Sequence, residues 1–336
     1  MRRVTYLTPT AKNPANGLST MTDITNHIKH NAAAQLLIVG SGEWTQAALA
    51  ACPAELTPAI ARLPSDVDLS AVKILLGAPG ELINFIPLCP KLQWVQSTWA
   101  GVDAIAHLAS ERLAITTLKG VFGQAMSEYV VGWLVAIERQ IITRANVTAW
   151  LDTADGTVAG KTVGIMGTGS IGTAIAQSCK AMHMRCKGLN SDGRLQPDFE
   201  TCFSTPDRLT FARGLDYLVS VLPDTSATQQ LVDQELLNQL APGAIFINVG
   251  RGNVVDENAL LAALRSGQLR SAVLDVFNTE PLPSDHAFWR TENLYITAHT
   301  AAPTPTHAIL TIFTENLNRF LNNAPLLHRV CQHKGY

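Results

Sequence analysis

The segment Val163-Gly-Ile-Met-Gly167-Thr-Gly169-Ser-Ile-Gly172 sets three spaced glycines between an apolar run and an apolar helix. The apolar patterning predicts a strand at 163–166, a helix at 171–182 and a second strand at 184–189. A glycine-rich turn between a strand and a helix is informative only in such a context, and here all three elements are in register.

Each small residue of this turn has a physical task. Gly167 permits the tight turn, Gly169 lets the backbone approach a pyrophosphate, and Gly172 lets the helix and the strand pack closely. Ser170 and Ile171 open the helix, where unpaired N–H groups attract phosphate. The turn is therefore predicted to bind a dinucleotide.

Further β-branched or leucine-rich runs recur on both sides of the turn, separated by segments long enough for helices. Before it, the runs predict strands at 4–7, 36–39, 72–76 and 92–96. From it onward, they predict strands at 163–166, 184–189, 217–222, 244–248, 272–276 and 294–297. Strands that alternate with helices are typical of parallel sheets, so the sequence predicts an α/β fold with two doubly wound parallel-sheet (Rossmann-like) domains.

The helices expected from the sequence indicate how the two domains are connected. Helices are predicted at 124–142, at 257–265 and, as an amphipathic segment, at 304–321. Asp256 and Gly267 suit the two ends of the second of these helices.

A single last helix cannot form a domain, so it is predicted to return to the first sheet. The cofactor domain, residues 99–299, would then be inserted into a discontinuous flavodoxin-like substrate-binding domain of residues 1–98 and 300–336.

Composition excludes several classes of function. The chain has 336 residues, of which 47% are hydrophobic and 15% charged, with a net charge of −2. This balance predicts no nucleic-acid partner. The apolar stretch at 130–137 falls short of the roughly 20 residues that a membrane span needs, so no membrane partner is predicted either. The six cysteines form no CxxC pair, which predicts a reducing, cytoplasmic location and no metal site.

The end of the second strand bears on the choice of cofactor. An NAD-binding domain usually carries an acidic residue there, but this chain has Asn190. Ser191 and Arg194 follow where they can bind a ribose 2'-phosphate, which predicts NADP in preference to NAD. Alternatively, Asp192 accepts a hydrogen bond from the ribose and Arg194 is a solvated loop residue.

Three later strands are each followed by a charged or titratable residue: Arg251, Glu280 and His299. Ligands of open α/β sheets bind at this carboxyl edge. Reduction of a 2-oxo acid needs a cation for the carboxylate and the carbonyl, an acid for the nascent alkoxide, and a group that tunes the acid. Arg251 can supply the first, His299 the second, and Glu280 can orient the imidazole and favour its protonated form.

Taken together, segments between residues 96 and 303 resemble the D-isomer-specific 2-hydroxyacid dehydrogenases. The resemblance rests on Ser220-Val-Leu-Pro-Asp-Thr225, on Gly252-Asn-Val-Val-Asp256-Glu, on Leu274-Asp-Val-Phe277 and on the three segments that carry the charged residues. The loop with Trp99 and the non-acidic second strand look most like the glyoxylate and hydroxypyruvate reductase branch. The resemblance implies an enzyme that reduces a small 2-oxo acid to the D-2-hydroxy acid by hydride transfer from NAD(P)H.

The resemblance also implies roles for individual residues. Arg251 would orient the substrate, His299 would be the acid or base, and Glu280 would pair with it. Cofactor contacts beyond the glycine turn are implied for Leu222, Pro223, Thr228, Val249, Gly250, Arg251, Asp275 and His299. Substrate contacts are implied for Trp99, Ala100, Gly101, Arg251 and His299. The segment 119–129 is similar to the one that enters the interdomain helix of relatives, where homodimers often form their contact.

Two departures and three alternatives accompany the resemblance. Ala298 stands where a proline commonly precedes the histidine, and Asn278 stands where an acidic residue is frequent. Formate dehydrogenases share the fold, but they carry glutamine where this chain has Glu280, which argues against formate. The chain could instead be a cofactor-sensing corepressor or scaffold without turnover, or a family dehydrogenase that acts on a different D-2-hydroxy acid.

Overall fold

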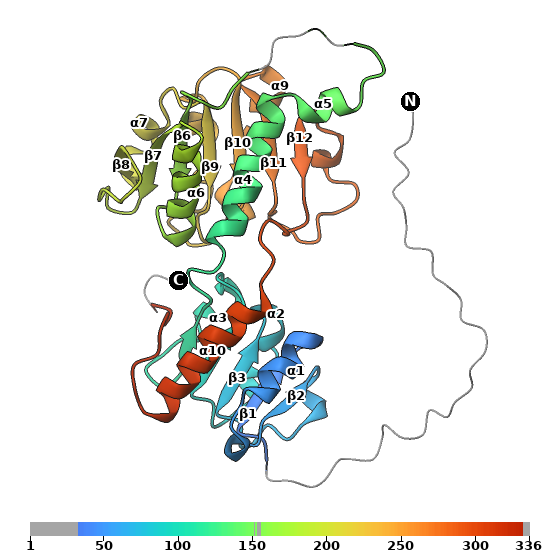
Figure 1. Cartoon of the computed structure of the whole chain (residues 1–336), viewed down its shortest axis with the longest axis vertical. Coiled ribbons are helices and arrows are strands. Elements are labelled where there is room, and N and C mark those ends of the chain that lie inside the picture. The colour runs from blue at the N-terminus through green and yellow to red at the C-terminus, as the bar shows by residue number, and fades with distance from the viewer. Residues whose placement is uncertain (1–32, 151, 153–155, 332–336) are drawn as a thin grey trace, which may run out of the picture. The chain divides into compact units, whose positions relative to one another are not determined.

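The computed structural model describes residues 33–150, 152 and 156–331. In this part of the chain the strands form two parallel sheets (Figure 1). The first sheet contains β1 (Leu36–Val39), β2 (Ala59–Ala61), β3 (Ile74–Gly77), β4 (Trp94–Ser97) and β5 (Ala114–Thr116). The second contains β6 (Thr162–Met166), β7 (Arg185–Asn190), β8 (Thr201–Ser204), β9 (Tyr217–Ser220), β10 (Ala244–Asn248), β11 (Leu269–Leu274) and β12 (Leu294–Ile296).

Both sheets are doubly wound. The first has the order β2-β1-β3-β4-β5 with parallel pairing, which is the flavodoxin-like order. The second has the order β12-β11-β10-β9-β6-β7-β8, again parallel, which is the order of dinucleotide-binding domains extended by one strand. In that sheet the order in which strands are added reverses between β6 and β9, so the predicted glycine turn, which follows β6, lies at the switch point where ligands bind.

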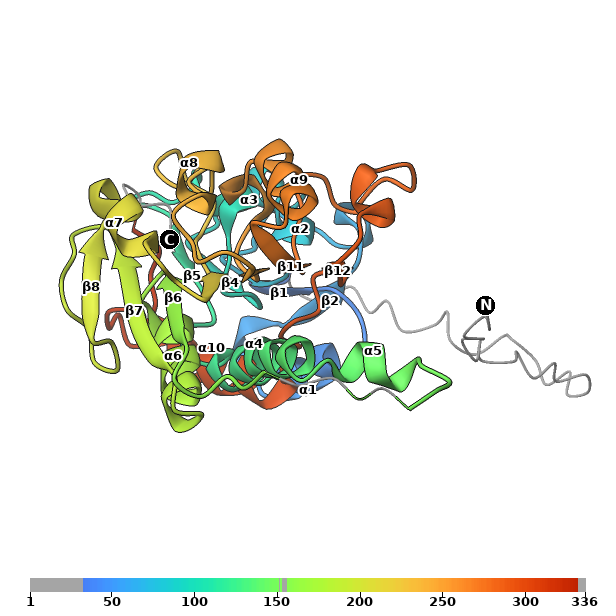
Figure 2. The same cartoon turned by 90° about the horizontal axis from the view of Figure 1, so that it is seen from above.

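Helices cover both faces of each sheet. The α-helices are α1 (Glu43–Ala50), α2 (Pro79–Leu82), α3 (Asp103–Ala106), α4 (Gly123–Glu138), α5 (Ile141–Ala145), α6 (Ser170–Ala181), α7 (Arg208–Ala212), α8 (Gln234–Leu237), α9 (Glu257–Ser266) and α10 (Thr306–Leu321). Figure 2 shows α4 and α6 on one side of the second sheet and α7, α8 and α9 on the other. None of the described helices is long and apolar enough to cross a bilayer.

The last helix, α10, packs on the first sheet. Its Ile309, Phe313 and Leu317 share an apolar cluster with residues of β1, β3 and β4. The ring of Phe313 stacks on that of the fully buried Trp94 of β4, with 5.9 Å between centroids. The prediction that the chain returns to its first sheet after the second is therefore confirmed.

A buried polar network fixes the position of α10 on the first sheet. Asn316 of α10 donates through Nδ2 to Gln96 Oε1 (3.0 Å) and to the Leu327 carbonyl (3.2 Å), and its Oδ1 accepts from Leu327 N (2.7 Å). Thr116 donates to the same Gln96 oxygen at 2.8 Å and accepts from the Trp94 indole at 2.8 Å. Because these buried groups have partners, the network holds α10 at one position on the sheet.

The structure corrects several predicted elements. The strands β2, β5 and β8 were not predicted, because β2 and β5 have only three residues each and β8 is a half-exposed edge strand. The helix predicted at 124–142 is wrong in its last turn: α4 ends at Glu138, and Gln140 takes a left-handed φ of 52°. The strand predicted at 4–7 lies outside the described residues. The capping of α9 by Asp256 and Gly267 is confirmed.

The position of β5 bears on the domain boundary. This strand lies beyond the boundary expected after residue 98, yet it pairs with β4 in the first sheet. The Val330 N–H also donates to the Ile115 carbonyl of β5, at 2.8 Å. We therefore propose that the substrate-binding part includes β5, and that the cofactor-binding part starts with α4.

We expect Asn316→Ala to lower the free energy of unfolding by about 1–3 kcal/mol, because it leaves the half-buried Leu327 amide without its partner. Urea denaturation followed by circular dichroism measures this loss. Asn318→Ala is the matched control, since Asn318 lies on the same helix but is exposed. Equal denaturation midpoints for the two variants would show that the network contributes nothing.

Candidate active site

Strand register brings the ends of β10, β11 and β12 to one edge of the second sheet. Asn248 of β10 pairs with Leu274 of β11, and Leu274 pairs with Ile296 of β12. These three residues are the last of their strands, so the segments carrying Arg251, Glu280 and His299 all leave the sheet at its carboxyl edge.

His299 and Glu280 form a direct pair. Nδ1 of His299 lies 2.8 Å from Oε2 of Glu280, and the two side chains are 38% and 37% exposed. The other carboxylate oxygen of Glu280 accepts from the Phe277 N–H at 2.9 Å. Glu280 is thus fixed by the backbone and holds one ring nitrogen, which leaves Nε2 of His299 for other partners.

His299 has an unusual backbone conformation. Its φ is 55°, in the left-handed region that non-glycine residues seldom adopt. Its N–H donates to the Asp275 carbonyl at 2.8 Å, and the next two N–H groups, of Thr300 and Ala301, donate to the Asp275 carboxylate at 2.8 and 3.0 Å. Asp275, which is 1% exposed, therefore holds the turn that carries His299.

A hydrogen-bonded chain connects this turn to α4. Thr297 donates through Oγ1 to Asp275 Oδ1 at 2.5 Å, so its oxygen accepts from the Tyr129 hydroxyl, 2.6 Å away. Burial raises the pKa of Tyr129 to about 12, which keeps the phenol protonated as a donor. The interdomain helix therefore supports the position of Asp275.

Arg251 lies in a tightly held turn. Asn248 donates through Nδ2 to the Arg251 carbonyl (2.9 Å) and accepts from the Gly250 N–H (3.1 Å). The guanidinium donates through Nε to Asp103 Oδ2 at 2.7 Å and through Nη1 to the Gly250 carbonyl at 2.8 Å. Asp103 is the first residue of α3, which follows β4 of the first sheet, so this ion pair joins the two halves of the site.

The loop after β4 contacts both reactive groups. The indole of Trp99 lies beside the imidazole of His299, with 5.9 Å between the ring centroids. A Cβ on Gly101 would lie 1.4 Å from Nη2 of Arg251, so any larger residue there would displace the guanidinium. Ser97 holds the loop, since its Oγ accepts from the Trp99 N–H (2.9 Å) and donates to the Trp99 carbonyl (3.0 Å). Ala100, between the two contacts, is exposed.

The glycine turn has the shape predicted from the sequence. Gly167 has a φ of 100°, and a Cβ on Gly172 would lie 1.8 Å from the Gly167 carbonyl oxygen. A Cβ on Gly169 would meet no atom within 4 Å, and both Gly169 and Ser170 are exposed at the N-terminus of α6. The turn therefore leaves open space before the helix, as a bound pyrophosphate requires. Ile171 is half-buried and packs on apolar residues.

The loop after β7 is organised by Asn190. Its Nδ2 donates to Thr168 Oγ1 (3.0 Å) and to the Arg194 carbonyl (2.9 Å), while its Oδ1 accepts from Gly193 N (2.7 Å). The amide is thus engaged within the loop. Ser191 and Arg194 are exposed, and the Arg194 guanidinium makes no hydrogen bond within the described residues.

The remaining predicted cofactor contacts lie at the ends of β9 and β10. Leu222 and Val249 are buried, and a Cβ on Gly250 would lie 2.5 Å from the Leu222 carbonyl oxygen. Thr228 uses its hydroxyl within the turn, where it donates to the Pro223 carbonyl at 2.6 Å. Pro223 is half-exposed.

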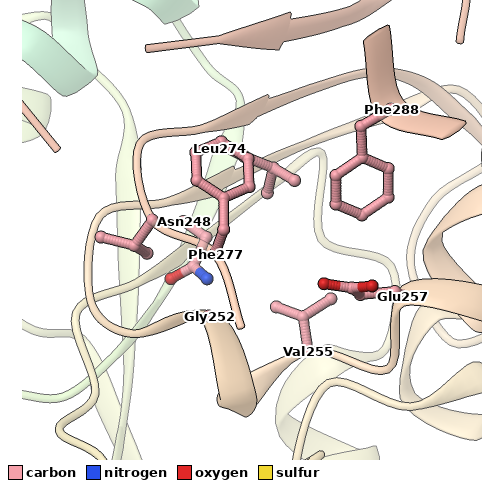
Figure 3. A pocket seen from close by; sticks show the side chains of 8 residues that line it. Asn248, Gly252, Val255, Glu257, Leu274, Phe277 and Phe288 are labelled. Carbon is pink, nitrogen blue, oxygen red and sulfur yellow. The ribbon is translucent and has the colours of Figure 1, made fainter. Parts of the chain in front are cut away.

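A small cavity of about 10 Å³ lies next to the Arg251 turn, lined by Asn248, Gly252, Glu257 and Phe277 among others (Figure 3). This volume is room for at most one water molecule, so the cavity is too small for a substrate. Within the described part of the chain, no three His, Cys, Asp or Glu residues are grouped as a metal site would require.

Two residues depart from the pattern of the family that the sequence resembles. Asn278 donates to Glu257 at 2.9 Å, and Ala298 is exposed.

Sequence reasoning did not assign roles to Asp103, Tyr129 and Thr297. Asp103 was visible as a charge in a glycine-containing loop, but nothing in the pattern connects it with an arginine 148 residues away. Tyr129 and Thr297 are 168 residues apart and are joined by one hydrogen bond. Such pairs depend on how the two sheets meet, which local patterns do not encode.

Comparisons with known proteins agree with this architecture. Residues 135–301 match the model for the NAD binding domain of D-isomer specific 2-hydroxyacid dehydrogenases. Glyoxylate/hydroxypyruvate reductase A of Serratia proteamaculans is 34% identical over 242 residues, which are 68% of this chain and 76% of that protein.

Solved structures extend the similarity to most of the chain. A D-isomer specific 2-hydroxyacid dehydrogenase family protein from Aeromonas salmonicida has a TM-score of 0.82 and 34% identity, and the match covers 89% of this chain and 100% of that one. The NADPH-dependent glyoxylate/hydroxypyruvate reductase from Sinorhizobium meliloti, in complex with NADP and sulfate, has a TM-score of 0.81 and 28% identity, with 90% and 100% covered.

The chain belongs to the D-isomer-specific 2-hydroxyacid dehydrogenase family. It is an NAD(P)-dependent oxidoreductase, and the fold class and family predicted from the sequence are confirmed.

We expect Gly101→Ala to lower kcat/KM by about 100-fold, because the new methyl group displaces the Arg251 side chain. Stability should change little, since the displaced group is the end of a flexible side chain. Steady-state kinetics and thermal denaturation measure the two effects. Gly80→Ala is the control, because a Cβ there meets no atom within 4 Å. Full activity of Gly101→Ala would contradict the close contact.

Proposed function

We propose that this enzyme reduces glyoxylate, hydroxypyruvate or a similarly small 2-oxo acid to the D-2-hydroxy acid, with NADPH as the preferred coenzyme. The observation that carries the proposal is the His299–Glu280 pair at 2.8 Å, which lies beside Trp99 at the sheet edge that also bears Arg251. The reductases from Serratia proteamaculans and Sinorhizobium meliloti support the choice of substrate, because both are named for glyoxylate and hydroxypyruvate.

When it is bound, the nicotinamide coenzyme supplies the hydride for the reaction. The open glycine turn at α6 would hold its pyrophosphate, and the backbone at Asp275 would meet its carboxamide. Arg251 binds the substrate carboxylate and polarises the adjacent carbonyl group. The backbone of the Trp99-Ala100-Gly101 loop binds the other side of the carboxylate.

His299 supplies the proton. Because Glu280 occupies Nδ1, the proton passes from Nε2 of the imidazolium to the carbonyl oxygen as that oxygen becomes an alkoxide. The carboxylate of Glu280 stabilises the imidazolium and keeps the ring oriented. In the reverse direction the neutral ring takes the proton from the hydroxyl group.

We expect His299→Ala to lower kcat/KM for glyoxylate and hydroxypyruvate by about 10²–10⁴-fold, which is the usual contribution of general acid catalysis to the rate. Arg251→Ala should lower it by at least as much. Loss of NADPH absorbance measures turnover. His307→Ala is the control, since His307 is exposed on α10. If NADPH binds to the wild-type protein and no 2-oxo acid is turned over, the protein is the cofactor sensor considered above instead.

The same assay tests Glu280. Glu280→Gln should lower kcat for reduction, because a neutral amide stabilises the protonated imidazole less than a carboxylate does. An unchanged kcat would remove Glu280 from its assigned role.

For the coenzyme, Ser191 and Arg194 are the proposed partners of the ribose 2'-phosphate. The NADP complex of the Sinorhizobium meliloti reductase supports NADP as the coenzyme but names no residues. The hydrogen bond from Asn190 to the Arg194 carbonyl supports it further, because it fixes the backbone of Arg194 beside Asn190 while the Arg194 side chain stays exposed. Asp192 accepts only from the Arg194 N–H, at 3.2 Å, among the hydrogen bonds of the described residues.

We expect Arg194→Ala to raise KM for NADPH by about 10-fold to 100-fold, the worth of a charge-assisted contact, and to leave KM for NADH unchanged. Titration of both coenzymes at fixed substrate measures the difference. Arg265→Ala, at an exposed position of α9, is the control. A wild-type preference for NADH would instead favour Asp192 as the ribose partner.

We propose further that the protein is a homodimer in which the α4–α5 segment meets its copy. Ile141 of α5 is 51% exposed and Trp150 is 94% exposed, which is costly for side chains of this size in water. A cytoplasmic location stays a prediction from the cysteine pattern.

A further inference from the structure

The side chain of Arg251 is long and flexible, so neighbouring residues have to fix the direction in which its guanidinium points. A carboxylate from the other half of the site contacts this side chain: Oδ2 of Asp103, at the start of α3, lies 2.7 Å from Nε of Arg251. The two side chains are only 28% and 25% exposed, so water screens this ion pair less than a surface pair. Each sheet packs on an apolar cluster of its own, so the folding of the two sheets does not depend on this ion pair.

We propose that Asp103 is a positioning residue for Arg251, which it holds so that one edge of the guanidinium faces the substrate; this inference rests on the proposed function. A guanidinium has five N–H donors in a planar fork. Asp103 takes the Nε donor and the Gly250 carbonyl takes one donor of Nη1. Three donors remain, one on Nη1 and two on Nη2, and one from each nitrogen can form a pair that matches the two oxygens of a carboxylate.

The partner of Arg251 is itself held in place. Asp103 is the first residue of α3, whose Ile105 and Ala106 are buried in the first sheet's apolar cluster. The loop before it is fixed by Ser97 and by the hydrogen bond from Leu118 N to the Trp99 carbonyl (3.1 Å). Nη2 of Arg251 also lies against Gly101 in this loop. Asp103 therefore aligns the arginine with the loop that binds the same substrate carboxylate.

Charge and position can be separated by substitution. Asp103→Ala removes the acceptor of the Nε–H bond and lets the side chain rotate. Asp103→Asn keeps an acceptor oxygen at the same distance along the side chain but removes the negative charge. If position matters, the asparagine variant should retain most of the activity that the alanine variant loses.

The first test is kinetic, with glyoxylate and hydroxypyruvate as substrates and saturating NADPH. We expect Asp103→Ala to lower kcat by about 10-fold to 100-fold and to raise KM several-fold, as for a misaligned group. Asp103→Asn should recover at least half of the loss in kcat, measured on a logarithmic scale. Glu111→Ala, an exposed acid beyond the end of α3, should behave as wild type. Wild-type kcat in Asp103→Ala, or equal losses in both Asp103 variants, overturns the proposal.

The second test needs no turnover and so separates this inference from the proposed function. In protein labelled with ¹⁵N-arginine, the Nε–H signal of Arg251 is identified by its absence from Arg251→Lys. We expect slow solvent exchange of this proton in the wild-type protein and in Asp103→Asn, and fast exchange in Asp103→Ala. If the wild-type protein turns over no 2-oxo acid, the proposed function fails, and this exchange alone decides: equal rates in wild type and Asp103→Ala overturn the inference.

Discussion

A carboxylate buried from water must find hydrogen bonds within the protein, and Asp275 finds them in the turn that carries His299. The left-handed backbone of His299 persists because these bonds offset its cost of about 1–2 kcal/mol. Through Thr297 the same carboxylate is tied to Tyr129 of the interdomain helix. The position of the imidazole, and with it the chemistry, therefore depends on a residue that need not touch the reacting atoms of the substrate.

The site is composite. The second sheet carries His299 and Arg251, whereas the first supplies the loop that contacts both, with Trp99 beside the imidazole and with Gly101 and Asp103 against the guanidinium. The glycine-rich turn by itself would make only a nucleotide-binding domain. Under the proposed function, selectivity for a small acid would come from the contact of that domain with the short loop after β4.

Local sequence patterns predict much of the fold and part of the candidate site. The glycine turn, the ends of β10 to β12 and the caps of α9 follow from spacing, because each depends on neighbours in the chain. The three-residue strands β2 and β5 were missed, since an alternating pattern needs more residues to be recognised. The support of His299 by Tyr129 and of Arg251 by Asp103 was also missed. These contacts join segments that only the packing of two sheets brings together.

The return of α10 to the first sheet also sets an order of assembly during translation. One face of β1 and β3, with Leu36, Ile38 and Ile74, is covered by Phe313 and Leu317 from the far end of the chain. The second sheet is complete as soon as β12 leaves the ribosome. The half that is synthesised first therefore keeps this apolar surface uncovered until α10 has emerged from the ribosome.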